Sequence, residues 1–302
     1  MIETKALNSI QDACPGVRFL ESEPLSAHTS FRIGGPAACM AFPKTPEELA
    51  SVLKAAYAHG VAPRILGAGT NVLAPDEGVD TLVICTKDAL LGLRTCEGTK
   101  IEAMAGETLA HTAVFARTLG YTGLEFAHGI PGTVGGGVYM NAGAYGGEIA
   151  QVAEETTILL PDGTQRILRG EEQSFGYRTS AFEKMPCVIV RTVFRLMPGD
   201  PEAIAARMRE LMAKRCASQP LELPSAGSTF KRPEGAYAGA LIEASGLKGC
   251  GVGGAEVSRK HAGFIVNTGG ATARDVRAAI EMVQKKVYED SGYRLEPEVR
   301  IW

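Results

Sequence analysis

Apolar side chains recur with helical spacing in four stretches of the chain, the pattern of helices with one buried face. The stretch after Thr45 carries further signals, because Thr45 can cap a helix, Pro46 fits its first position and Glu48 can complete a capping box. Gly60 is expected to end this helix. A second predicted helix runs from Thr108 to Leu119. A third follows Pro201, and its apolar face carries Ile204, Met208, Leu211 and Met212. The fourth starts at Thr272 with Asp275 in its first turn, and its apolar side carries Val276, Ala279, Ile280, Val283 and Val287.

Shorter apolar runs bounded by turn residues predict strands between these helices. Pro161-Asp162-Gly163 separates two such runs and predicts a hairpin. A break at Pro198-Gly199-Asp200-Pro201 precedes the third helix. We expect an α+β fold of three domains, residues 1–77, 78–200 and 201–302. The predicted strands cover residues 61–66, 81–85, 100–103, 156–160, 165–168, 188–196, 263–267 and 298–302.

The composition is that of a globular protein, with 302 residues, 45% apolar and 22% charged side chains. A net charge of −3 argues against a nucleic-acid-binding protein. Seven cysteines are scattered singly without a C-x-x-C pair, which disfavours a zinc or dithiol site and suits a reducing cytosol. The start has no apolar signal-peptide core, and no run of 18 apolar residues occurs. We therefore expect a cytoplasmic protein without a metal, nucleic acid or membrane partner.

Many of the 36 glycines gather in two loops. One is Gly67-Ala68-Gly69-Thr70-Asn71 after a predicted strand, and the other runs from Gly129 to Gly137 and continues through 141–147. Glycine loops expose successive backbone N–H groups that can bind a diphosphate, although a single pair of glycines more often only makes a turn. Neither loop is a P-loop or a G-x-G-x-x-G motif. Two such loops favour a dinucleotide held outside a Rossmann fold.

The chain resembles the UDP-N-acetylenolpyruvoylglucosamine reductase family, within the vanillyl-alcohol-oxidase-like (PCMH-type) FAD-binding superfamily. The resemblance runs from about residue 25 to 302 and implies two FAD-binding subdomains, 1–77 and 78–200, followed by a substrate-binding domain. Its motifs, in order, are Ser30-Phe31-Arg32-Ile33-Gly34-Gly35, the loop from Gly67 to Asn71, the loop from Gly129, Asn141-Ala142-Gly143-Ala144-Tyr145-Gly146, Tyr177-Arg178-Thr179-Ser180, Ala226-Gly227-Ser228-Thr229-Phe230-Lys231, Lys260 to Asn267, and Leu295-Glu296-Pro297-Glu298-Val299.

The resemblance implies a flavoenzyme of peptidoglycan precursor synthesis. NADPH would reduce FAD, which would then reduce the enolpyruvyl group of UDP-N-acetylenolpyruvoylglucosamine to give UDP-N-acetylmuramate. The implied FAD-binding residues are Gly67, Ala68, Gly69, Thr70, Asn71, Gly129, Ile130, Pro131, Gly132, Val134, Gly135, Gly136, Asn141, Gly143 and Ala144, with most contacts expected from backbone N–H groups. The first loop contains no histidine, so FAD is expected to bind non-covalently.

Three residues are the implied catalytic set. Arg178 would stabilise the enolate that forms when hydride is added, because a guanidinium matches a carboxylate and keeps its charge. Ser228 would protonate the enolate carbon, with Lys231 or a water chain resupplying the proton. Glu296 would lie near the substrate carboxylate and act in its protonated form. By composition alone, each could instead be an ordinary surface or turn residue.

Other positions are weaker candidates. Tyr145, Tyr177, Lys231 and Lys248 are predicted to contact the substrate, and His128 to line the flavin site. Lys231, Arg232, Lys248, Arg259 and Lys260 form a cationic set for the diphosphate, while His261 is expected to be structural. Arg232 stands where many relatives carry asparagine. The chain resembles the short form of the family and is expected to be a monomer. The alternatives are another superfamily oxidase acting on a sugar or lactone, and a non-catalytic flavin or nucleotide-sugar binding protein.

Overall fold

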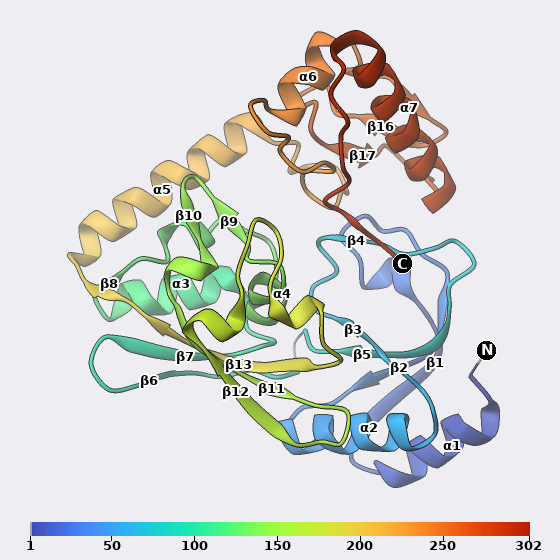
Figure 1. The fold of residues 1–302 in the computed structure, drawn as a ribbon, viewed down its shortest axis with the longest axis vertical. Coiled ribbons are helices and arrows are strands. Elements are labelled where there is room, and N and C mark those ends of the chain that lie inside the picture. The colour runs from blue at the N-terminus through green and yellow to red at the C-terminus, as the bar shows by residue number, and fades with distance from the viewer. Residues whose placement is uncertain (1, 88) are drawn as a thin grey trace. The chain divides into compact units, whose positions relative to one another are not determined.

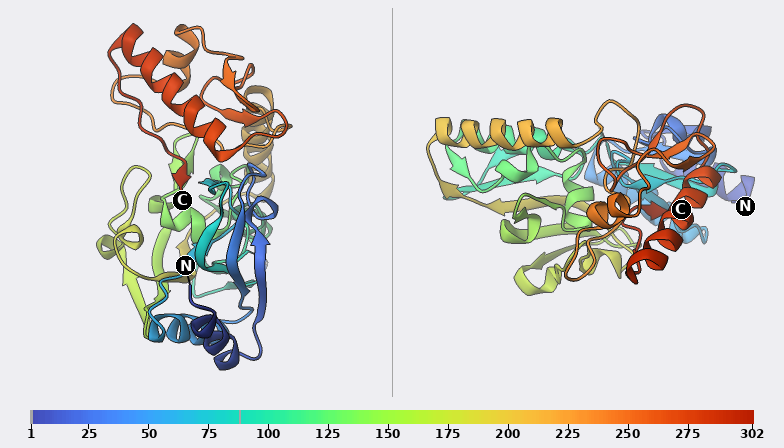
Figure 2. Two further views of the ribbon diagram at one scale, coloured as in Figure 1. Left: turned by 90° about the vertical axis from the view of Figure 1, so that its right-hand side faces the viewer. Right: turned by 90° about the horizontal axis from the view of Figure 1, so that it is seen from above.

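The computed structural model describes residues 2–87 and 89–302, which form two compact units (Figures 1 and 2). Unit 1 comprises Met1–Ser22, Ala38–Ala68 and Asp80–Lys214, and unit 2 comprises Glu23–Ala37, Gly69–Val79 and Arg215–Trp302. Helices and strands are mixed in both units, which confirms the predicted α+β class. The predicted boundaries at residues 77 and 200 remain a prediction, since the two units divide the chain at other positions.

Two sheets form the framework of unit 1 (Figure 1). A four-stranded sheet has the order β1-β2-β5-β3, with β3 and β5 parallel. A five-stranded antiparallel sheet has the order β12-β11-β13-β7-β6 and contains the predicted hairpin as β11 and β12. The strands are β1 (Arg18–Pro24), β2 (Pro36–Phe42), β3 (Arg64–Leu66), β5 (Val79–Cys85), β6 (Leu93–Thr95), β7 (Lys100–Met104), β11 (Ala153–Leu159), β12 (Gln165–Arg169) and β13 (Val188–Arg195).

The helices of unit 1 that precede Pro201 are α1 (Thr4–Ala13), α2 (Pro46–Ala58), α3 (Leu109–Thr118) and α4 (Val134–Tyr139). The sequence predicts α2 and α3, whereas α1 and α4 were not predicted. Thr45 caps α2 by accepting the Glu48 N–H at 3.1 Å, as predicted. The predicted capping box is wrong, because the Glu48 carboxylate instead accepts the N–H of Lys44 at 2.6 Å. The apolar faces of α1 and α2 bury Ile10, Leu49 and Val52 in one core with the strands.

Helix α5 (Pro201–Ser218) follows the predicted break. Ile204, Met208 and Leu211 are buried as expected, whereas Met212 is 37% exposed. Consecutive helical positions are rotated by about 100°, so Met212 leaves the face that Leu211 occupies.

The remaining short strands are β4 (Val72–Leu73), β8 (Tyr121–Thr122), β9 (Gly143–Ala144), β10 (Gly147–Glu148) and β14 (Met197–Pro198).

In unit 2, α7 (Ala273–Ser291) packs on a three-stranded sheet of order β15-β16-β17 (Figures 1 and 2). Thr272 and Asp275 form a reciprocal capping box, and the predicted apolar face from Val276 to Val287 is buried. The other elements are α6 (Ala238–Ala244), β15 (Gly251–Val252), β16 (Ala255–Val257), β17 (Ile265–Asn267) and β18 (Arg300–Ile301), the last paired parallel with β4.

Two segments from early in the sequence complete the core of unit 2. Phe31, Ile33 and Leu73 are buried in the same cluster as the apolar face of α7. The Asp76 carboxylate accepts the N–H groups of Ala273 and Arg274, at 2.6 and 3.0 Å, and so satisfies donors that the first turn of α7 leaves open. Unit 2 also carries the second half of the first glycine loop, from Gly69 onward.

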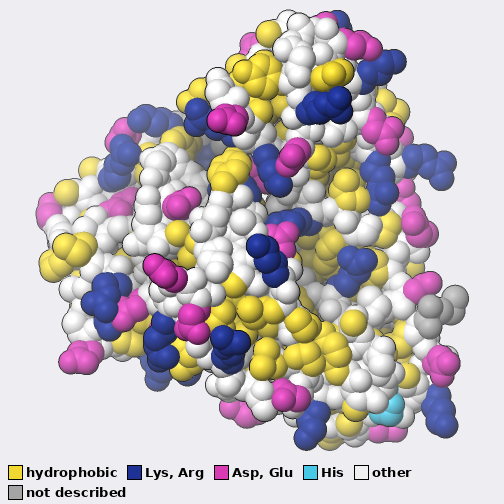
Figure 3. Space-filling model, in the orientation of Figure 1, with side chains coloured by type: hydrophobic (Ala, Val, Ile, Leu, Met, Phe, Trp, Pro, Cys, Tyr) yellow, Lys and Arg dark blue, Asp and Glu magenta, His cyan; other side chains and the backbone are white. Residues whose placement is uncertain are grey.

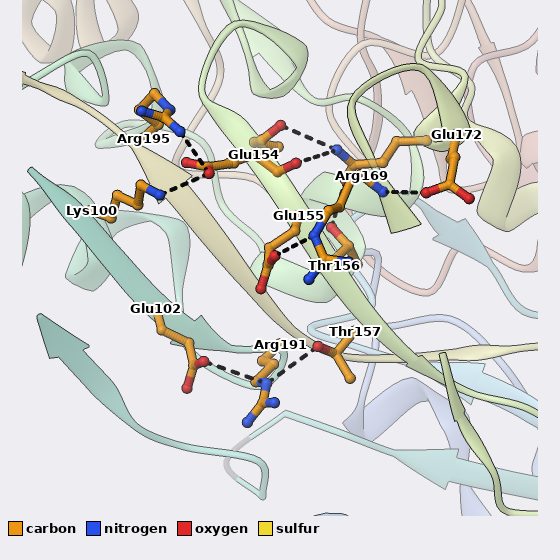
Figure 4. A network of polar contacts seen from close by, with 12 residues as sticks. Lys100, Glu102, Glu154, Glu155, Thr156, Thr157, Arg169, Glu172, Arg191 and Arg195 are labelled. Atoms are coloured by element: carbon orange, nitrogen blue, oxygen red, sulfur yellow. Dashed lines mark hydrogen bonds and ion pairs between the residues drawn. The ribbon is translucent and has the colours of Figure 1, made fainter. Parts of the chain in front are cut away.

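Many charged side chains of unit 1 are paired with each other on one face of the five-stranded sheet (Figure 4). Glu154 accepts from Lys100 at 2.9 Å and Arg195 at 2.7 Å, and Glu102 pairs with Arg191 at 3.4 Å. Positive and negative side chains are also interspersed on the face drawn in Figure 3. The carboxylates of these pairs are buried or partly buried, and they neutralise cations that could otherwise attract an anion. Among the described residues, every helix is too short or too polar to cross a membrane.

Candidate active site

The two predicted dinucleotide loops meet inside unit 1. Gly67 follows β3, and Thr133 caps α4 by accepting the Gly136 N–H at 3.2 Å. A Cβ atom on Gly67 would lie only 2.6 Å from the Thr133 hydroxyl oxygen, so only glycine permits this approach. The first loop therefore lies against the start of α4, where the second loop becomes helical.

Several backbone N–H groups of the second loop already have partners. Those of Ile130, Val134 and Gly135 donate to Ala127, Glu107 and Ala105 carbonyl oxygens, at 3.0, 2.7 and 2.9 Å. These donors, and that of Gly136, cannot bind a diphosphate without giving up an internal bond. Contacts from these positions would instead use their small surfaces, which allow a ligand to approach the backbone.

The second half of the first loop is fixed within unit 2. Gly69 has a φ of 62°, and a Cβ atom there would lie 2.1 Å from the carbonyl oxygen of His28. The Ser30 N–H donates to the Gly69 carbonyl oxygen at 3.1 Å, and the Ser30 hydroxyl donates to the Ser225 carbonyl oxygen at 2.6 Å. Ser30 thus connects this loop to the segment that leads to Ser228.

Asn71 ends the first loop and is held by the C-terminal segment. Its backbone carbonyl accepts the Arg300 N–H at 2.9 Å, and its side-chain amide donates to the Glu298 carbonyl oxygen at 3.2 Å. The loop and the segment carrying Glu296 are therefore parts of one hydrogen-bonded framework in unit 2.

His128 directly precedes the second loop. Its Nδ1 atom is buried, and no described residue forms a hydrogen bond with it. A buried polar atom of this kind is costly unless a ligand or water satisfies it. Two observations fit a dinucleotide bound beside the second loop. They are the close approach of Gly67 to Thr133 and the unsatisfied imidazole nitrogen of His128.

Arg178 occupies a tight turn in unit 1. Gly176 and Thr179 exchange two backbone hydrogen bonds, at 3.0 and 3.3 Å, and leave Tyr177 and Arg178 at the two central positions. Arg178 has a φ of 56°, a conformation that usually requires glycine. Its guanidinium donates to the Gly143 carbonyl oxygen at 3.1 Å and lies 5.4 Å from the centre of the Tyr177 ring.

Positive φ also occurs in unit 1 at the non-glycine residues Asn141, Tyr145 and Ser174. Tyr145 and Gly146 form the two-residue turn between β9 and β10, which leaves the Tyr145 side chain exposed. Tyr177 is also 53% exposed. Left-handed non-glycine residues are strained and concentrate at functional sites, so they mark the surroundings of Arg178 as a candidate site.

Ser228 and Glu296 lie on paired segments of unit 2. Lys231 N–H donates to the Glu296 carbonyl oxygen at 2.8 Å, and Glu298 N–H donates to the Thr229 carbonyl oxygen at 2.7 Å. Thr229 is buried, and its N–H and hydroxyl bond to Gly263 and Ile265. Both Ser228 and Glu296 are exposed on this rigid pair. The structure thus brings two of the predicted catalytic residues onto adjacent segments, while Arg178 belongs to unit 1.

The cations predicted to meet a diphosphate already have partners within unit 2. Lys231 pairs with Glu296 at 3.3 Å, and Lys248 pairs with Glu243 at 2.5 Å. The remaining contacts are Arg259 with Glu256, Lys260 with the Cys216 carbonyl oxygen, and Arg232 over the Tyr237 ring at 3.9 Å. Substrate binding at any of these positions would therefore compete with, or add to, a contact that already exists.

His261 has the structural role expected from the sequence. Its Nδ1 atom accepts the Gly263 N–H at 3.1 Å, and its ring packs edge-on against Phe264. Burial lowers the pKa of the His261 imidazole. A neutral ring with Nδ1 as an acceptor suits this contact.

Sequence reasoning assigned no role to Thr133 or Asp76, and none to Ser30 beyond its motif. Thr133 could have been found, because threonine before a helical segment is a capping signal. Asp76 and Ser30 act on partners nearly 200 residues away, at Ala273 and Ser225, and no local pattern reveals such contacts.

The fold and the two loops define an FAD-binding flavoprotein. Residues 37–169 match the family model described as "FAD binding domain". Residues 219–302 match the model described as "UDP-N-acetylenolpyruvoylglucosamine reductase, C-terminal domain".

Known proteins identify the family. The UDP-N-acetylenolpyruvoylglucosamine reductase of Limosilactobacillus reuteri subsp. reuteri is 45% identical over 97% of this chain and 98% of its own. That of Caldanaerobacter subterraneus subsp. tengcongensis is 46% identical over 93% of this chain and 92% of its own. The crystal structure of the Thermus caldophilus reductase covers 95% of this chain and 98% of its own, with 35% identity and a TM-score of 0.79. The chain therefore belongs to the UDP-N-acetylenolpyruvoylglucosamine reductase family, and the predicted flavoenzyme class is confirmed.

Proposed function

We propose that this chain catalyses the NADPH-dependent reduction of UDP-N-acetylenolpyruvoylglucosamine to UDP-N-acetylmuramate, a step of peptidoglycan precursor synthesis. Bound FAD supplies the hydride-transfer chemistry. The observation that carries the proposal beyond family membership is the strained turn that holds Arg178, with its guanidinium fixed on the Gly143 carbonyl oxygen. A cation fixed at this cost suits a reaction that builds negative charge on a carboxylate-bearing carbon.

Arg178 stabilises the enolate in this proposal. Its planar guanidinium can bind both oxygens of the substrate carboxylate and cannot lose its proton. One terminal nitrogen already donates to Gly143, so the side chain is orientated before the substrate arrives. A group that is orientated in advance stabilises the transition state without reorganisation.

Ser228 delivers the proton to the enolate carbon. It is exposed next to buried Thr229, whose contacts with Gly263 and Ile265 fix the backbone on its C-terminal side. Glu296, 73% exposed on the paired segment, contacts the substrate carboxylate. Lys231, which already pairs with Glu296, is the group that can resupply the Ser228 proton through water.

The proposed binding residues follow the same division between the units. In unit 1, Gly67, Ala68, Gly129, Ile130, Pro131, Gly132, Val134, Gly135, Gly136, Gly143 and Ala144 are proposed for non-covalent FAD, together with Asn141 through its backbone alone, and Tyr145 and Tyr177 are proposed for the substrate. In unit 2, Gly69, Thr70 and Asn71 are proposed for FAD, and Lys231 and Lys248 for the substrate.

We also propose that the enzyme is a cytoplasmic monomer. All seven cysteines are free thiols, which suits a reducing compartment, and NADPH and UDP-sugars are cytoplasmic metabolites. Light scattering at 31.9 kDa would agree with a monomer, whereas twice that mass would contradict it.

Anaerobic stopped-flow absorbance with Ser228→Ala tests the function. We expect NADPH to bleach the flavin in the wild type and UDP-N-acetylenolpyruvoylglucosamine to restore its absorbance without oxygen. Ser228→Ala should keep the bleaching step and slow the recovery by about 100-fold or more, the usual contribution of a general acid. Recovery in the wild type only after air is admitted would indicate an oxidase instead, and a Ser228→Ala variant with normal recovery would exclude the serine as proton donor.

A further inference from the structure

Asn141 is a buried polar residue that contacts the Arg178 turn. Its side chain is 1% exposed, and its φ of 48° is left-handed. The side-chain nitrogen donates to the Gly176 carbonyl oxygen at 2.9 Å, and the side-chain oxygen accepts the Ala150 N–H at 2.9 Å. Both ends of the amide are therefore used within unit 1.

These bonds form a closed ring around Arg178. Gly176 is the first residue of the turn that carries Arg178, and Asn141 binds its carbonyl oxygen. At the other end, the Arg178 guanidinium donates to Gly143, only two residues beyond Asn141. The ring thus joins the base of the turn and the tip of the arginine to one short segment.

We propose that Asn141 is a positioning residue for Arg178 and that its side chain does not bind FAD. The proposal rests on the proposed function, because it assigns Asn141 to the step in which Arg178 acts. An amide that is 1% exposed and bonded at both ends presents almost no surface to the cofactor, whereas moving Gly176 would move the arginine directly.

Asparagine meets three requirements at this position. It tolerates left-handed backbone better than most residues, it donates to Gly176, and it accepts from Ala150. Aspartate keeps the acceptor but places a carboxylate oxygen against the Gly176 carbonyl oxygen. Glycine keeps the backbone conformation and loses both bonds, so Asn141→Asp and Asn141→Gly test the same ring in different ways.

The experiment is a double-mutant cycle of Asn141→Asp, Asn141→Gly and Arg178→Ala, followed by anaerobic stopped flow. We expect each Asn141 variant to slow flavin reoxidation by UDP-N-acetylenolpyruvoylglucosamine about 10- to 100-fold, since misplacement of a catalytic group by about 1 Å has effects of this size. Flavin bleaching by NADPH, the Kd for FAD and the flavin spectrum should stay unchanged. In the Arg178→Ala background, the Asn141 substitutions should cause no further slowing.

Asn267→Asp is the matched control. Asn267 is also a buried amide that donates to a carbonyl oxygen, that of Phe31, and accepts backbone N–H groups, but it lies in unit 2. Its effect on reoxidation should be the same with and without Arg178. If Asn141→Asp fails to fold, Asn141→Gly gives the same comparison, because glycine adopts a positive φ without strain.

Two outcomes overturn the proposal separately from the function. Further slowing by Asn141 variants in the Arg178→Ala background would show that Asn141 acts without the arginine. A weakened Kd for FAD with normal reoxidation would make Asn141 a cofactor-binding residue. If Arg178→Ala alone reoxidises at the wild-type rate, the role of Arg178 in the proposed function fails, and the positioning role fails with it.

Discussion

Arg178 and Tyr145 occupy left-handed backbone conformations that glycine would adopt without strain. Such positions cost about 1–3 kcal/mol each, and the cost persists only where neighbouring contacts hold the residue in place. At Arg178 those contacts are the Gly176–Thr179 turn and the Gly143 carbonyl oxygen. Arg178 thus combines a strained backbone with hydrogen bonds that hold both its turn and its guanidinium. Surface arginines such as Arg94 and Arg166 pair with carboxylates.

His261 provides a prediction of pH dependence at the residue scale. Burial lowers the pKa of its imidazole below the ordinary value of about 6.5, so the folded state binds this proton less tightly than the unfolded state. The free energy of unfolding should therefore rise with pH: the contribution is complete above about pH 6.5 and is lost as pH falls through the folded-state pKa. Thermal melting at pH 7 and pH 5 should show a smaller decrease in Tm for His261→Gln than for the wild type. Equal decreases would contradict this account.

At the scale of elements, short-range signals determine where helices begin and end. Thr45 and Thr272 cap α2 and α7 as their sequences predict, and Gly60, with a φ of 70°, follows α2. The apolar face of α7 is buried at all five predicted positions. These features need only a few neighbouring residues, so they can be predicted without knowledge of the fold.

Two glycines with similar φ separate a local requirement from a tertiary one. Gly60→Ala meets no atom within 4 Å and should destabilise the protein by about 1 kcal/mol through its left-handed backbone alone. Gly69→Ala would place a Cβ atom 2.1 Å from the His28 carbonyl oxygen, so the loop must move. We expect a clearly larger loss of stability and weaker FAD binding for Gly69→Ala, measured by urea unfolding and FAD titration. Equal effects of the two substitutions would argue that the close contact at Gly69 relaxes freely.

At the scale of the whole molecule, each unit has its own hydrophobic core. The core of unit 1 includes residues of both predicted FAD subdomains, such as Leu49 and Ile158. The core of unit 2 recruits Phe31 and Leu73 from early in the chain. Because the first glycine loop is divided at Ala68 and Gly69, the proposed FAD-binding residues belong to both units.

Release of FAD tests the proposed non-covalent attachment. Acid precipitation should leave the flavin absorbance in the supernatant, whereas a covalent flavin would stay with the precipitated protein. Free FAD should also stabilise the folded state, by about 1.4 kcal/mol for each tenfold increase in its concentration above the Kd. A melting temperature that does not respond to added FAD would contradict binding of the free cofactor to the folded chain.

The sequence by itself determined the helices α2, α3, α5 and α7, eight of the strands, the α+β class and, through its ordered motifs, the family, but it did not predict α1, α4, α6 or strands such as β1 and β2. The predicted features depend on local spacing, capping and turn chemistry, and on residue order. Only the tertiary structure showed that Asp76 caps α7, that Ser30 connects Gly69 to Ser225, and that Asn141 donates to Gly176 at the start of the Arg178 turn. The physical reason is separation along the chain. A buried amide or carboxylate can bind any backbone group that folding brings within about 3 Å, and its own sequence neighbourhood does not specify which group that is.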